Sequence, residues 1–99
     1  MYIVRDIFHL QFGHFKEANK LIKQAKQQGF LSSQASNRHI LSDFTGESYR
    51  LIMEEGYNSL NEYELDLSKE MAADTWQQWY AEFKKHVRWS EREILKEIK

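Results

Sequence analysis

The stretch Tyr2-Ile3-Val4-Arg5-Asp6-Ile7-Phe8-His9-Leu10-Gln11-Phe12 alternates in polarity and decides the fold class of this chain. One face of the stretch is apolar or aromatic apart from Asp6, and the other face mixes apolar with polar side chains. Alternation at every second residue, among β-branched and aromatic residues, predicts a strand over residues 2–12. The mixed face indicates that the second side of this strand does not face water alone.

An amphipathic helix is predicted over residues 14–28, directly after Gly13. Four apolar residues recur there at helical spacing: Phe15, Ala18, Ile22 and Ala25. Charged residues, mostly lysines, fall on the opposite side, which is typical of a helix that covers a core with one face. Gly29 follows the last turn, where glycine commonly ends a helix.

Two further strands are predicted over residues 37–44 and 48–55, on either side of the turn Phe44-Thr45-Gly46-Glu47. Gly46 supplies the positive φ that a tight hairpin requires. Apolar residues alternate on both sides of the turn, which favours a hairpin that packs on one face.

A second helical region follows Gly56. Ser59-Leu60-Asn61-Glu62 matches a capping box, in which the hydroxyl and the carboxylate each bind an end amide. The apolar stripe changes phase across residues 71–74, which predicts a break with Asp74 as the N-cap of a second segment. That segment carries an aromatic stripe, Trp76, Trp79, Tyr80 and Phe83, which is more typical of a core than of a cofactor platform.

The tail decides between two topologies. Ser90-Glu91-Arg92-Glu93 is also a capping box, so the local pattern of the tail favours a helix. A strand there would instead complete the order β-α-β-β-α-β, the ferredoxin-like α+β fold. Crossovers of the same hand place both helices on one face of a four-stranded antiparallel sheet. The bare second face then favours a homodimer.

These stretches resemble small dimeric α/β-barrel proteins, and most closely uncharacterised bacterial relatives of the NIPSNAP branch. The resemblance rests on the opening residues 2–8 with Gly13, on residues 57–64, and on residues 79–83 leading to residues 92–95. It covers nearly the whole chain, and its motifs are structural rather than catalytic. It implies a fourth strand at about 89–98, which we adopt over the local helical pattern, and a dimer that closes a barrel.

Composition narrows the class of protein. The 99 residues fit one domain, residues 1–99, and 14 Lys+Arg against 15 Asp+Glu give no basic excess for nucleic acid or anionic membranes. The absence of cysteine excludes disulfides and thiolate zinc sites. We expect no membrane span and, because the start does not read as a signal peptide, a cytoplasmic location.

Four polar residues are the predicted lining of a ligand site: Arg5, His9, Arg50 and Glu54. The first two lie on the mixed face of the first strand, and the other two share a face of its expected neighbour. Inside a dimer these residues would form a polar cluster within an apolar shell, where a neutral histidine could act as a base or donor. The alternative is a salt-bridged network that only holds the interface together.

No metal site and no cofactor is expected. His9, His14, His39 and His86 do not follow the spacing of a metal site, and His39 belongs to a strand that is not adjacent to the first. We expect His14 and His86 to face solvent or to pack. Haem-degrading proteins that share the resemblance use an Asn on the first strand together with a Trp and a His on the second helix. Here the first strand has no Asn, although His86 and Trp76 or Trp79 lie in the right region.

Three functions remain open from the sequence, and it does not decide whether the protein is an enzyme. The first is binding of a small apolar or aromatic ligand in the barrel cavity, which the high aromatic content, 14% of the residues, favours. The second, implied by the resemblance, is a cofactor-independent monooxygenase or a haem-degrading enzyme. The third is a structural dimer whose barrel is filled.

Overall fold

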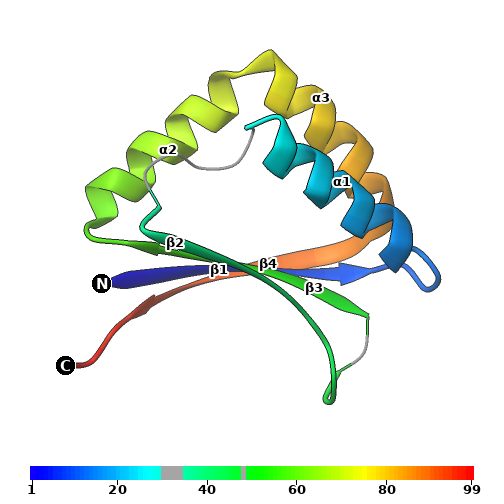
Figure 1. Ribbon diagram of the computed structural model, residues 1–99, viewed down its shortest axis with the longest axis horizontal. Coiled ribbons are helices and arrows are strands. Elements are labelled where there is room, and N and C mark those ends of the chain that lie inside the picture. Colours follow the sequence, from blue (N-terminus) through cyan, green and yellow to red (C-terminus); the bar gives the residue numbers. More distant parts are fainter. Residues whose placement is uncertain (30–34, 48) are drawn as a thin grey trace.

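The computed structural model describes residues 1–29, 35–47 and 49–99. Across these residues, β1 (Tyr2–Leu10), β2 (Asn37–Ser42), β3 (Arg50–Tyr57) and β4 (Val87–Lys96) form one antiparallel sheet in the order β2-β3-β1-β4. Helices α1 (Phe15–Gln27), α2 (Leu60–Ala72) and α3 (Asp74–Phe83) lie on one side of that sheet (Figure 1). A short 3-10 helix, η1 (Lys84–His86), leads from α3 into β4. The predicted ferredoxin-like α+β topology is therefore confirmed.

Strand β1 holds the sheet together because it pairs with β3 on one side and with β4 on the other. Val4 and Leu10, at even positions, are buried on the side of the helices. Ile7, at an odd position, pairs with Ile52 on β3 and with Glu91 on β4, on the side away from the helices. The alternation in the sequence thus separates a face of β1 that the helices cover from a face that they leave uncovered.

The core lies between the helices and β1 and β3. Its buried members are Leu10, Ala18, Ile22, Ala25, Leu51, Met53, Trp79 and Phe83. Three of the four apolar residues that predict the first helix are among them. The indole N–H of Trp79 donates to the carbonyl oxygen of Leu21 at 2.8 Å, which links α3 to α1. The helical spacing of the apolar residues therefore places these helices on the sheet.

The tail is a strand, as the resemblance implies and against the local helical pattern. Strand β4 pairs with β1 from Tyr2 opposite Lys96 to Leu10 opposite Val87, with an irregularity between His9 and Leu10. It therefore runs two residues earlier than the expected 89–98. Pairing along the free edge of β1 satisfies the backbone groups that the two strands direct at each other, and this long-range gain outweighs helix propensity.

The predicted hairpin is shorter than expected. Strand β2 ends at Ser42 rather than at residue 44, and β3 begins at Arg50 and continues to Tyr57. Residue 48, the predicted start of the second strand, lies outside the described residues. Gly46 has φ +95°, which confirms the left-handed conformation expected of the turn.

The helical break at residues 71–74 is confirmed, but its predicted cap is wrong. Ala73 has an extended backbone with φ −85° and ψ 122°, and it is the N-cap residue of α3. Asp74 is therefore the first helical residue, where its carboxylate faces the positive end of the helix dipole. Ser59 caps α2 as predicted, because its Oγ accepts from the Glu62 amide at 3.2 Å. The Glu62 carboxylate accepts from the Asn58 amide at 3.3 Å instead of from that of Ser59.

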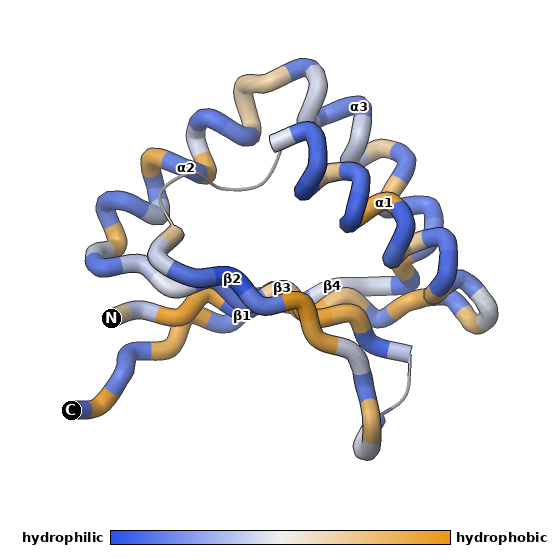
Figure 2. Tube along the Cα trace, in the orientation of Figure 1, coloured by the Kyte–Doolittle hydropathy of each residue, from blue (hydrophilic) through white to orange (hydrophobic). Residues whose placement is uncertain are grey.

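No helix covers the second face of the sheet within the described part of the chain (Figure 1). The strands carry hydrophobic segments interrupted by hydrophilic ones (Figure 2). We call this surface the open face; its apolar members are Ile3, Ile7, Leu41, Ile52, Trp89 and Leu95. Leu41, Trp89 and Leu95 are more than 40% exposed. None of the helices in the described ranges is both long and apolar enough to span a membrane.

Candidate functional site

The four residues predicted to line a ligand site share the open face. Arg5 pairs with Glu54, and His9 pairs with Arg50, in the register of β1 and β3. The Arg5 guanidinium binds the Glu54 carboxylate at 3.0 Å and that of Glu93, on β4, at 3.3 Å. The predicted proximity of Arg5 and Glu54 is therefore present, as an ion pair within the sheet.

His9 and Arg50 take other partners. The buried His9 ring lies between two carboxylates, with Nε2 3.2 Å from Glu91 and Nδ1 3.4 Å from Glu47. It stacks on Trp89 with ring centroids 3.8 Å apart. Arg50 binds Asp43 at 2.9 Å. These contacts resemble the salt-bridged network that the sequence offers as the alternative to a ligand site. A ligand-binding role for the four residues stays a prediction.

His14 and His86 contact each other rather than only solvent or apolar side chains. Their Nδ1 atoms lie 2.9 Å apart, so one ring donates and the other accepts. This contact joins the start of α1 to the end of η1. Among residues 1–29, 35–47 and 49–99, no group of three or more His, Asp or Glu side chains could hold a metal ion.

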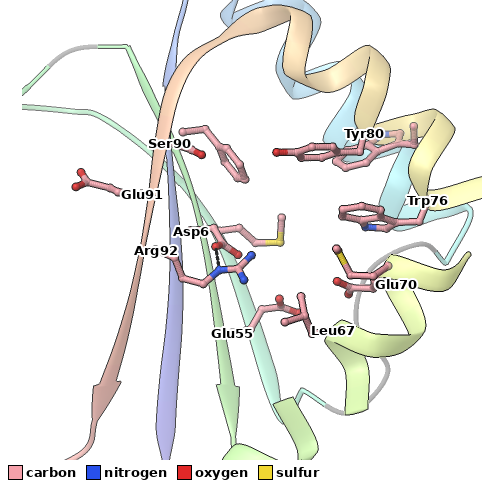
Figure 3. A pocket seen from close by; sticks show the side chains of 13 residues that line it. Asp6, Glu55, Leu67, Glu70, Trp76, Tyr80, Ser90, Glu91 and Arg92 are labelled. Carbon is pink, nitrogen blue, oxygen red and sulfur yellow. Dashed lines mark hydrogen bonds and ion pairs between the residues drawn. The ribbon is translucent and has the colours of Figure 1, made fainter. Parts of the chain in front are cut away.

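A cavity of about 660 Å³ lies on the other side of the sheet, beneath α2 and α3 (Figure 3). Its apolar and aromatic lining comes from β1, β3 and both helices: Phe8, Met53, Leu67, Met71, Trp76, Trp79 and Tyr80. The rings of Trp76 and Tyr80 stack within the wall, with centroids 4.9 Å apart and planes 7° from parallel. Stacking covers one face of each ring, so the pair directs ring edges and the Tyr80 hydroxyl toward the cavity (Figure 3).

One end of the cavity is polar. Asp6, the exception on the apolar face of β1, binds Arg92 of β4, which also donates to the Tyr63 hydroxyl at 2.6 Å. Glu55 lines the same end, where its carboxylate accepts from Arg38 at 3.1 Å. Burial raises the pKa of Glu55, and the arginine opposes this effect.

Glu70, on α2, is the carboxyl group with the most perturbed environment. Its side chain points into the cavity from the helical wall, across from Arg92 (Figure 3). Burial, and after it the nearby carboxylates of Glu55 and Asp66, together raise the pKa of Glu70 to about 7. Such a group exchanges a proton near neutral pH, which suits a binding or catalytic site better than a structural ion pair.

Glu70→Gln should stabilise the protein at neutral and alkaline pH. Because the pKa of Glu70 is higher in the folded than in the unfolded protein, protonated Glu70 favours the folded state. This contribution to the free energy of unfolding is fully present below about pH 4.5 and is lost as the pH rises through about 7. Above that pH the variant should unfold with a free energy about 1 kcal/mol higher, after allowance for solvent screening in the cavity. Urea denaturation at both ends of this range measures the difference. Equal stability of the two proteins above about pH 7 would contradict the assigned environment.

Sequence reasoning points to part of this cavity without locating it. The aromatic stripe predicted as core divides in two, because Phe83 is fully buried and Trp79 is 8% exposed, whereas Trp76 and Tyr80 are only partly buried. Asp6 stands out in the sequence as a polar residue on an apolar face, and this was the available signal for the polar end. Glu70 has no such signal, because a glutamate in a helix is ordinary.

Comparison with known proteins finds the same fold in solved structures. No family model and no curated protein matches the chain. An uncharacterized NIPSNAP domain protein from Burkholderia xenovorans superposes with a TM-score of 0.86 at 15% identity, over 99% of this chain and 95% of that chain. A NIPSNAP family protein from Agrobacterium tumefaciens superposes with a TM-score of 0.84 at 20% identity, over 95% and 82%.

A more distant structure extends the comparison. A putative antibiotic biosynthesis monooxygenase from Nitrosomonas europaea superposes with a TM-score of 0.76 at 10% identity, over all of both chains. At these identities the likeness concerns the fold alone. The chain therefore has the ferredoxin-like fold shared by NIPSNAP-domain proteins and antibiotic biosynthesis monooxygenases, as the resemblance in its sequence implies.

Proposed function

We propose that the protein binds a small aromatic molecule in the cavity between the sheet and helices α2 and α3. The observation that carries this proposal is the cavity of about 660 Å³ with its stacked Trp76–Tyr80 wall. Its volume falls within the range of small-molecule sites, and a largely apolar lining with a few polar groups is typical of them. The proposal keeps the expected class of ligand but locates it on the helical side of the sheet rather than on the open face.

The proposal includes a homodimer formed through the open face. Apolar side chains on this face, among them Ile52 and Trp89, remain accessible in a single chain. The charged residues between them already form ion pairs within the sheet, such as Arg5 with Glu54. The apolar part of this face is suited to burial against a second copy, and the paired charges keep partners within their own sheet when it is covered.

Trp76→Leu should weaken the binding of 2-phenylethanol, a neutral aromatic probe, about fivefold, because the stacked ring is replaced by a smaller aliphatic chain. Isothermal titration calorimetry measures the affinity. Phe44→Leu is the matched control, because Phe44 is fully exposed on the β2–β3 turn. Equal losses in both variants would contradict the assigned site. If the probe binds neither the wild type nor a variant, the structural dimer without a ligand becomes the better account.

A second candidate function is oxygenation of an aromatic substrate without a cofactor. It is supported by Glu70, a carboxyl group that can take up a proton near neutral pH beside an aromatic wall. The monooxygenase described above has the same fold. An oxygen electrode distinguishes the two functions, since a binding protein consumes no oxygen with a bound phenol, whereas an enzyme should do so and lose the activity in Glu70→Gln.

A further inference from the structure

The carboxyl groups that point into the cavity differ in how their charge is balanced. Asp6 is paired with Arg92, and Glu55 is paired with Arg38. The Glu70 side chain makes neither a hydrogen bond nor an ion pair among the described residues, although it points into the cavity (Figure 3). Glu91 points away from the cavity and binds His9 on the open face. Glu70 is thus a partly buried acceptor without a counterion of its own.

We propose that the ligand of this cavity is an arylalkylamine, whose protonated amine binds Glu70 while its ring packs against the aromatic wall. This inference rests on the proposed function and adds the chemical class of the ligand. An ammonium group is the missing counterion, and a charge-assisted hydrogen bond to a partly buried carboxylate is among the stronger polar contacts in proteins.

The charges around Glu70 select a cation over an anion. The carboxylates of Glu55, Asp66 and Asp6 act on Glu70 in the same direction, and Arg92 opposes them. The local potential is therefore negative, and a ligand carboxylate or phenolate placed beside Glu70 would be repelled. A ligand with a neutral hydroxyl group would leave the ionised form of Glu70 without compensation.

The geometry of the wall suits a cation attached to an aromatic body. Glu70 and Trp76 face the cavity from the same helical side, with Trp76 stacked on Tyr80 (Figure 3). An ammonium group bound to Glu70 lies beside an indole face, which attracts cations. The opposite side of the cavity is apolar, with Phe8 and Met53, and can hold the ring of the ligand.

Three probes with the same aromatic body test this inference: 2-phenylethylamine, 2-phenylethanol and 3-phenylpropionate. By calorimetry at about pH 8, the amine should bind about tenfold more tightly than the alcohol, and the carboxylate should bind most weakly. The advantage of the amine should disappear at about pH 5, where Glu70 is neutral, whereas an alkylamine stays protonated across this range. The affinity for the amine therefore rises as the pH increases through about 7.

Glu70→Gln should remove the advantage of the amine at about pH 8 and leave the affinity for the alcohol unchanged within about twofold. Glu64→Gln is the matched control, because Glu64 is an exposed glutamate on the same helix. If the amine binds no more tightly than the alcohol, and Trp76→Leu still weakens binding of the alcohol, the inference is overturned and the proposed function stands. If none of the three probes binds, both are overturned.

Discussion

Phe83→Ala is expected to lower the free energy of unfolding by about 3–5 kcal/mol, the usual cost of removing a fully buried aromatic ring. Phe83 is 0% exposed at the end of α3. Its ring meets Phe8 of β1 edge-on, with centroids 4.9 Å apart, and stacks on Trp79 at 5.0 Å. These contacts join the last turn of α3 to the centre of the sheet, so their loss opens a cavity at the junction.

Chemical denaturation monitored by circular dichroism measures this effect. Phe44→Ala removes the same number of atoms from a fully exposed ring, so it should change the stability by less than about 0.5 kcal/mol. A loss below about 1 kcal/mol in Phe83→Ala would mean that α3 does not pack on the sheet as described.

Ile52→Glu is expected to convert the proposed dimer into a monomer, with a dissociation constant raised at least about 100-fold. Ile52 lies at the centre of the open face, opposite Ile7 on β1 and Leu41 on β2. In a two-fold dimer each substitution is present twice, so two carboxylates would lose water in one interface. Analytical ultracentrifugation across a range of concentrations measures the change.

Leu65→Glu serves as the control for that experiment, because Leu65 is also an exposed apolar residue, 49% accessible, but belongs to α2. The control should leave the association state unchanged. A wild-type protein that is monomeric at high concentration, or a dimer that withstands Ile52→Glu, would show that the open face is not the interface.

Sequence patterns predict much of this fold because the faces of its elements are chemically distinct. The alternation of residues 2–12 predicts β1, and the spacing of Ala18, Ile22 and Ala25 predicts a helix that packs on the core. Strand β4 is different, because its residues suit a helix locally and are extended only through pairing with β1. Long-range pairing of this kind leaves little trace in a single segment, so the resemblance was needed to predict it.

The candidate site was harder to predict because it depends on how α2 and α3 are set over the sheet. The sequence predicts a break between the two helices, but not the hollow that the break leaves beneath Trp76 and Glu70. The predicted cluster of Arg5 with Glu54 does share one face, yet its charges neutralise each other there. Side-chain partners of this kind follow from tertiary geometry rather than from residue spacing.

The most direct test of the ligand cavity uses the indole N–H signals of the three tryptophans in an NMR titration with 2-phenylethylamine. Trp76 lines the cavity, whereas Trp89 stacks on His9 across the sheet on the open face. Tryptophan-to-phenylalanine variants assign the signals. The account predicts that the Trp76 signal shifts in a saturable manner while the Trp89 signal stays in place. A saturable shift of Trp89 with an unmoved Trp76 would contradict the account and place the ligand on the open face.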